Sequence, residues 1–504
     1  MNTTGMRRAA PLVFVALAVA VLFMLFPERE DALDWTGREE ITILLTEHGF
    51  EPESVFITRG TNVVFVSERG NEFWPASDLH PFHTIYSAFD AKRPLSPDES
   101  WSFVFEKDGH WSFHDHIDAL ATGAIIVIPP GAVADERYDV IPECDQESLD
   151  GRRACWKLRI KYTLEKKDLA AAFDEIQRVY EDQADFREDC HLYAHDLGIV
   201  AYQRYGDDIP FTPKIATCGQ GFYHGYMEAF LSWHEGDVVA ASEFCEHARE
   251  RLGTVFPLSG PQCHHGIGHG QMEYLLATRL DLLRDLPQLV GIGITDCGKL
   301  PDDDAQFRCA SGIYAVMKDW VNIQDLFHVY PEFFSLADPY ALCRYVSEDW
   351  AKRACAWELS KEVYLLAEKD PDIAFPAEIS AGQAWEPKYL DLMIRSTAFL
   401  IGEVGITLSD EELAASCRSI REQQFKIWCI QGIEQGLLFN GHPGGNEVER
   451  SVRFCRSDVL SDAEREGCEE VLVSYMQGAY GTTGQKSACE ALRALDLSSA
   501  GCET

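Results

Sequence analysis

Cysteine is missing from the first 143 residues, although the chain of 504 residues holds sixteen cysteines in all. This absence excludes thiolate ligands and disulfides from the N-terminal part and sets it apart from the rest. Basic residues are also scarce, with 44 lysines and arginines against 82 acidic residues and a formal charge of -38. Such acidity disfavours binding to nucleic acids or to anionic lipid, because their phosphates would be repelled.

Several catalytic signatures are missing as well. The sequence has no Walker phosphate loop, no Gly-x-Ser-x-Gly elbow, no dinucleotide fingerprint after a strand and no Cys-x-x-Cys-His for covalent haem. The chain is too long for one ordinary core, and 46% of its residues are hydrophobic. We therefore expect two or more ordered domains.

One long uncharged run stands near the start of the chain, over residues 9–27. Two arginines precede it and acidic residues follow it, as in a segment that spans a membrane with residues 1–8 in the cytoplasm. We predict an uncleaved transmembrane anchor because the run ends in the bulky Leu25 and Phe26; a cleaved signal peptide is the alternative. In both cases the rest of the chain is exported, to the periplasm or the cell exterior.

Residues 36–129 have the pattern of a small all-β domain. Apolar residues alternate at 41–45, 55–57, 63–66 and 101–105, and turn residues separate these segments. Short alternating strands at this spacing predict a sandwich or barrel.

The order of motifs over residues 40–129 resembles the cupredoxin family, Greek-key β-sandwiches that hold copper at one end. The resemblance rests on the run 49–65, the segment 95–103 and the run 109–116 (GHWSFHDH), which leads to the strand 123–127. It implies a first copper ligand at His83, before the closing loop, and three further ligands, a Cys, a His and a Met, on that loop. Those three places hold Asp115, Asp118 and Ala121, so a blue-copper site is excluded.

The closing loop carries His114-Asp115-His116 instead, which is similar to the His-x-His of multicopper oxidases, where both imidazoles bind copper. Residues i and i+2 of a strand point to one face, so both rings can reach one ion. His83 would complete a three-nitrogen site, and His80 is a candidate fourth ligand or supporting group. Imidazole ligation suits Cu2+, with zinc as the alternative cofactor. A metal-free cluster of solvated loop histidines is the competing interpretation.

After a linker at 130–143, residues 144–504 change to helical spacing, as in 166–181 and 362–369. The segments 218–228 and 263–273 agree at six positions, and further copies of the cysteine and glycine follow at Cys309 and Cys429. A period near 45 residues predicts an all-α array of stacked helix pairs.

The sixteen cysteines fall into neighbouring partners with similar separations. Because export permits oxidation, we predict eight local disulfides, each joining the end of one helix to the start of the next. Metal-bound thiolates are the alternative, although no Cys-x-x-Cys occurs. The predicted pairs are Cys144–Cys155, Cys190–Cys218, Cys245–Cys263, Cys297–Cys309, Cys343–Cys355, Cys417–Cys429, Cys455–Cys468 and Cys489–Cys502.

A second group of histidines lies in the first helical repeats. Its members form pairs four residues apart, so each pair shares a helix face, and three neighbouring helices can bring them to one groove. We predict a second metal or catalytic site there, and close helix packing with histidines bonded to backbone carbonyls is the structural alternative. The residues are His191, His195, His224, Glu228, His269 and Glu273, with His264 and His265 near the same turn.

Together these patterns predict a membrane-anchored, extracytoplasmic metal-binding protein with a cupredoxin-like sandwich and a disulfide-rich helical-repeat domain. Its function would be to hold or relay copper, with electron transfer as the activity and a protein or redox partner docked on the helices. A metal-dependent enzyme centred on the helical histidines is one alternative, and an extracellular interaction scaffold is another.

Overall fold

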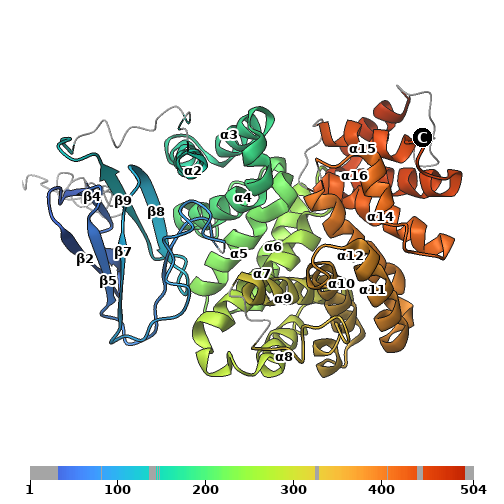
Figure 1. Cartoon of the computed structure of the whole chain (residues 1–504), viewed down its shortest axis with the longest axis horizontal. Helices are drawn as coiled ribbons and strands as arrows, with labels where there is room; N and C mark the ends of the chain where they lie inside the picture. Colours follow the sequence, from blue (N-terminus) through green and yellow to red (C-terminus); the bar gives the residue numbers. More distant parts are fainter. Residues whose placement is uncertain are drawn as a thin grey trace, which may run out of the picture.

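The computed structural model consists of an N-terminal β region followed by a helical domain (Figure 1). The structure describes residues 32–80, 82–134, 144, 146, 148–323, 329–405, 407–439 and 446–493. The anchor predicted over residues 9–27 lies outside the described residues. Within the described ranges, no helix is long and apolar enough to cross a membrane.

The β region is built from two sheets. One has the strand order β1-β4-β9-β8-β6 and the other the order β3-β2-β5-β7, and each sheet mixes parallel and antiparallel pairs. The strands are β1 (Leu33–Asp34), β2 (Glu40–Thr46), β3 (Gly49–Glu51), β4 (Ser54–Thr58), β5 (Asn62–Ser67), β6 (Pro75–Ser77), β7 (Ser100–Val104), β8 (Gly109–Asp115) and β9 (Thr122–Ile128).

The alternation that predicted these strands is the alternation of buried and exposed side chains. In β2 every second residue is buried, because one face of its sheet covers the core and the other meets solvent. The two sheets pack face to face through aromatic rings: Phe113 of β8 lies 4.8 Å from Phe50 and 5.4 Å from Phe65 on the opposite sheet, measured between ring centroids.

The helical domain follows from residue 149 onward. Its helices are α2 (Leu149–Lys166), α3 (Leu169–Asp182), α4 (Ala184–Tyr205), α5 (Gly221–Trp233), α6 (Val238–Leu252), α7 (Ser259–Thr278), α8 (Leu286–Cys297), α9 (Asp303–Ile323), α10 (Asp349–Leu366), α11 (Pro371–Trp385), α12 (Leu390–Val404), α13 (Asp410–Ala415), α14 (Gln423–Phe439), α15 (Asn446–Arg456) and α16 (Asp462–Arg493).

Two helix boundaries differ from the sequence prediction. The periodic segment 166–181 is divided, because Asp168 caps a new helix by accepting a hydrogen bond from the Ala171 N–H. The segment 362–369 is the last part of α10, which ends at Leu366; residues 368 and 369 have positive φ angles and leave the helix.

Alternate helices form a row in which α4, α5, α7, α9, α10, α12, α14 and α16 each contact the next. Glycine allows the close approach at several crossings. A Cβ on Gly225 of α5 would lie 2.0 Å from the His195 carbonyl oxygen of α4, and a Cβ on Gly312 of α9 would lie 2.2 Å from the His265 carbonyl oxygen of α7. The repeated glycines are therefore the points where neighbouring backbones touch.

Seven of the eight predicted disulfides are present, from Cys144–Cys155 to Cys455–Cys468, all with the predicted partners. The eighth pair includes Cys502, which lies outside the described residues. Cys297 lies at the end of α8 as predicted and pairs with Cys309 in α9, but the predicted placement at a helix end is wrong for Cys190 and Cys245, which lie well inside α4 and α6.

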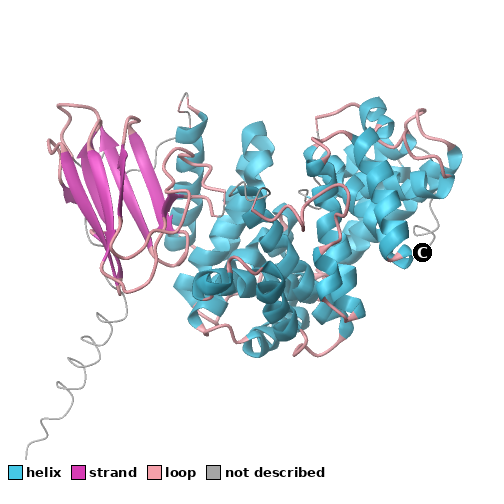
Figure 2. Cartoon of the chain, turned by 60° about the horizontal axis from the view of Figure 1, so that its bottom comes forward, coloured by secondary structure: helices cyan, strands magenta, loops and turns pink. Residues whose placement is uncertain are grey.

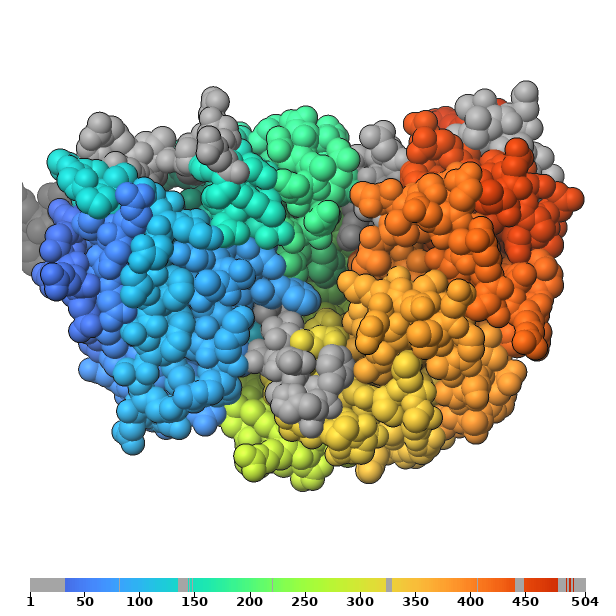
Figure 3. Space-filling model, in the orientation of Figure 1, coloured from blue at the N-terminus to red at the C-terminus, as the bar shows by residue number. Residues whose placement is uncertain are grey.

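The strands lie together at one end of the molecule and the C-terminus lies at the other (Figure 2). The labels in Figure 1 show α2 and α4 next to the β region and α14, α15 and α16 at the far end. In the space-filling view the β region is in direct contact with the rest of the chain (Figure 3). Strand β8 packs against α2, and the loop between β6 and β7 meets α5 and α7 through His80. The histidines that the sequence singled out lie at or near this contact.

Candidate metal centre

Four histidines of the β region converge on one point. His80 and His83 come from the loop after β6, His114 ends β8 together with Asp115, and His116 follows at once. One ring nitrogen of each lies within 4.8 Å of the other three. These are the four residues that the sequence predicted as metal ligands, and tertiary folding brings all of them together.

Buried carboxylates orient two of these rings. Asp90 Oδ2 lies 2.7 Å from His83 Nδ1, and Asp78 Oδ1 lies 2.7 Å from His114 Nδ1. A carboxylate can only accept, so each Nδ1 carries the proton and each Nε2 keeps its lone pair. Carboxylates that accept from histidine in this way are the usual supporting groups of protein metal sites.

The lone pairs of these two rings face the other two histidines. His114 Nε2 lies 3.1 Å from His80 Nδ1, and His83 Nε2 lies 3.0 Å from His116 Nδ1. Hydrogen bonds between the rings therefore pair these four nitrogens, and an ion placed among them would replace both bonds. His83 also has a positive φ of 53°, a strained conformation of the kind found at ligand sites.

Burial lowers the pKa of each ring in the cluster. The effect takes the pKa of His80 to about 4 and that of His116 well below the ordinary value. For His83 and His114, the hydrogen bonds that they donate to Asp90 and Asp78 offset part of the same effect. All four rings are therefore neutral near pH 7, the state in which imidazole binds metal ions.

The helical domain places two carboxyl groups beside this cluster. His80 Nε2 lies 3.6 Å from Glu228 Oε1 of α5 and 3.5 Å from Glu273 Oε1 of α7, and Glu228 Oε2 lies 3.3 Å from His195 Nε2 of α4. Burial raises the pKa of Glu228 to about 7 and that of Glu273 to about 8. The sequence assigned these two glutamates to the second histidine group, and the structure places both beside His80.

A buried lysine connects the two domains. Lys157 of α2 is bonded to Asp78 and lies 2.6 Å from Asp196 of α4. Burial alone would raise the pKa of Asp78, but Lys157 and His114 hold it well below its usual range. The residue that orients His114 is therefore kept ionised by a helix of the other domain. Sequence reasoning missed Asp78, Asp90 and Lys157, because no spacing pattern marks them.

The acidic residues on the closing loop have structural roles. Asp115 is buried, and its Oδ1 accepts hydrogen bonds from the backbone N–H of Trp74 (2.8 Å) and Ile117 (3.2 Å). Burial raises its pKa to about 7. Asp118 accepts from the Arg69 guanidinium at 2.8 Å. Neither side chain belongs to the group of converging ligand atoms.

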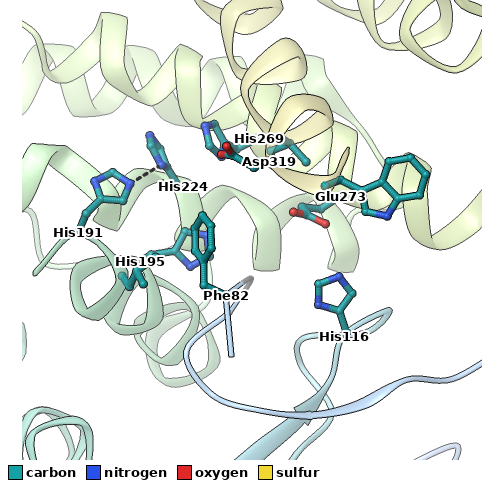
Figure 4. A pocket seen from close by; sticks show the side chains of 11 residues that line it. Phe82, His116, His191, His195, His224, His269, Glu273 and Asp319 are labelled. Carbon is teal, nitrogen blue, oxygen red and sulfur yellow. Dashed lines mark hydrogen bonds between the residues drawn. The ribbon is translucent and has the colours of Figure 1, made fainter. Parts of the chain in front are cut away.

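A second group lies on the helices, where His224, His265 and His269 each offer a ring nitrogen within 4.8 Å of the others. His191 Nε2 lies 3.1 Å from His224 Nδ1 (Figure 4). The predicted members His191, His195, His224, His269 and Glu273 line one cavity of about 80 Å³, to which the β region adds Phe82 and His116. His265, noted only as a neighbour in the sequence, belongs to the converging group.

Comparisons with known proteins identify no family for this chain. A scan against protein-family models gives no match to the chain, and a search of curated proteins gives none either. The function is therefore inferred from the arrangement of the residues.

Proposed function

We propose that this chain is an extracytoplasmic metal-binding protein that holds one copper ion in the β region on His80, His83, His114 and His116. The observation that carries this proposal is the convergence of four neutral imidazoles, two of them held by buried carboxylates. Four neutral nitrogens with supporting carboxylates are a favourable environment for a divalent transition metal.

The donor set supports Cu2+, because four neutral imidazole nitrogens suit this ion, with zinc as the alternative. The resemblance of the β region to cupredoxins supports electron transfer or copper relay as the role of the ion.

The decisive experiment is metal analysis of the full chain. Wild-type protein loaded with Cu2+ and desalted should keep copper in the β region and give the EPR spectrum of nitrogen-ligated Cu2+. The His114→Ala variant should lose this copper, and the control His48→Asn, on the exposed turn between β2 and β3, should keep it. Wild-type protein that retains neither copper nor zinc would show the proposal to be wrong.

The compartment is part of the same proposal. Seven disulfides support an oxidising environment outside the cytoplasm, and the uncharged run at 9–27 supports a membrane anchor. Cell fractionation tests this, because deletion of residues 9–27 should move the protein out of the membrane fraction and leave its cysteines reduced.

The cavity favours one alternative function. Histidines from both domains line it together with Glu273 and Asp319, an arrangement suited to a metal-dependent reaction on a small molecule. The two functions are distinguished by His269→Asn, which should abolish such an activity and leave the copper of the β region in place.

A further inference from the structure

The histidines of α5 and α7 make a group of their own on the helical side of the cavity. His224 lies on α5, while His265 and His269 lie four residues apart on α7. Ring centroids are 3.8 Å apart for His224 and His269, 5.1 Å for His224 and His265, and 4.9 Å for His265 and His269. Three imidazoles on two helices thus meet within the span of one metal ion's ligands.

Close helix packing produces this meeting. A Cβ on Gly266 of α7 would lie 2.5 Å from the Tyr223 carbonyl oxygen, and a Cβ on Gly270 would lie 2.4 Å from the Met227 carbonyl oxygen, both on α5. Only glycine permits such an approach. The shared pattern of 218–228 and 263–273 therefore sets both the contact between the helices and the relative position of their histidines.

A chain of hydrogen bonds fixes the proton on His224. The Cys218 carbonyl can only accept, so His191 donates to it from Nδ1 over 3.1 Å. The neutral His191 ring then accepts at Nε2, which makes His224 Nδ1 the donor of the 3.1 Å bond between them. The lone pair of His224 is left on Nε2. Burial, the largest influence, lowers the pKa of His191 to about 4 and that of His224 well below the ordinary value, so both rings are neutral.

Each of the other two rings also has a nitrogen that could bind a metal ion. His265 is hydrogen-bonded to the backbone of Arg308 on α9, which leaves its second nitrogen for another partner. His269 Nε2 is buried and has no hydrogen-bond partner among the described residues. An unsatisfied buried nitrogen is costly, and a bound cation would remove that cost.

Two carboxyl groups border the cavity. Glu273 and Asp319 line it together with His224 and His269, and burial, with a smaller effect of Asp319, raises the pKa of Glu273 to about 8, so a bound cation would favour the ionised form of Glu273. The cavity has room for several water molecules. We propose that His224, His265 and His269 bind a second divalent transition-metal ion, with a remaining coordination position open to the cavity and with His191 as the positioning residue for His224. This inference goes beyond the copper site of the β region and does not depend on it.

The experiment compares metal content in the full chain. Apo protein is loaded with Cu2+ alone, desalted and analysed for bound copper by mass spectrometry, with EPR on the same samples. The variants are His265→Asn/His269→Asn for the helical site and His83→Asn/His114→Asn for the β-region site. The matched control is His264→Asn, because His264 is buried beside His265 but faces Ser242 Oγ at 3.2 Å.

We expect about two ions in wild type and in the control, and about one in each double variant. If the helical double variant binds as much copper as wild type, the second site is refuted. If the β-region double variant alone keeps its full copper content, the copper site of the β region is refuted and the second site stands. Circular dichroism checks folding, and if the helical double variant is unfolded, His269→Gln alone should show the loss of one ion.

Discussion

Replacing the carboxylates behind the histidines should weaken metal binding without removing a ligand. Asp78→Asn and Asp90→Asn keep the shape of each side chain and a hydrogen-bond acceptor for His114 or His83, but they remove the negative charge. Loss of such a supporting group costs about 10- to 100-fold in metal affinity, or about 1.4 to 2.7 kcal/mol.

The structure also predicts which variant loses more. Asp78 and Asp196 both pair with Lys157, whose side chain is 7% exposed, whereas Asp90 pairs with Lys92, whose side chain is 65% exposed. In Asp78→Asn, Lys157 keeps Asp196 alone, so the buried surroundings of the incoming cation lose one negative charge that water does not screen, while solvent screens Lys92 in Asp90→Asn. We therefore expect about 100-fold weaker binding for Asp78→Asn and about 10-fold for Asp90→Asn. Removing the lysine as well, in Asp78→Asn/Lys157→Met, should restore part of the loss.

The assay is titration of the metal-free full chain with Cu2+ against a chelator of known affinity at pH 7.5. The control is Asp115→Asn, which changes an equally buried carboxylate that stands between the two ligands of the closing loop but bonds only to backbone N–H groups. Its affinity should stay within about threefold of wild type, because no ligand ring depends on it. Equal affinities for all three variants would refute the orienting role of Asp78 and Asp90.

Three further tests, made with four variants, address the helical domain. Burial raises the pKa of Glu378 to about 7 from an ordinary 4.5, so the folded state binds its proton more tightly than the unfolded state does. The stability that this group contributes is therefore present below pH 4.5 and is lost as the pH rises towards 7. Between these two pH values, the free energy of unfolding of Glu378→Gln, measured in urea, should rise by about 3 kcal/mol relative to that of wild type. A difference between the two proteins that stays constant with pH would contradict this prediction. Gly225→Ala should lower the free energy of unfolding by about 1–3 kcal/mol through overpacking against α4. Gly291→Ala should raise it by about 0.5–1 kcal/mol, because the new Cβ has no described atom within 4 Å apart from the adjacent residues and backbone of its own helix. Removing the Cys297–Cys309 bridge with two serines should cost about 3 kcal/mol, and this difference should vanish once a reductant opens the bridges of both proteins.

Local patterns were sufficient for much of the fold. Alternation located β2, β4, β5 and β7 because a strand with one face on the core repeats every second residue. The disulfide partners were equally local, since each bridge closes a loop between neighbouring segments. The single helical segment predicted over 166–181 was wrong at its start, because one capping residue, Asp168, begins a new helix there.

Local sequence patterns predicted only part of the candidate metal centre. The His-x-His spacing and the nearby His80 and His83 predicted the four converging rings, but nothing in the sequence marked Asp78 or Asp90 as their supports. The helical spacing of four residues grouped Glu228 with His224, yet the glutamate lies beside His80 because the β region docks against that face of the helices.

Residue type and short-range periodicity were therefore enough to predict the two structural classes, seven of the cysteine pairs and the four histidines of the β-region cluster. The packing of distant segments settles what these patterns leave open: which helical histidines converge, which carboxylates orient the rings and which cavity both groups border. Those relations join residues far apart in the chain, such as Lys157 with Asp78 and His80 with Glu273, and they exist only when the β region and the helices pack together.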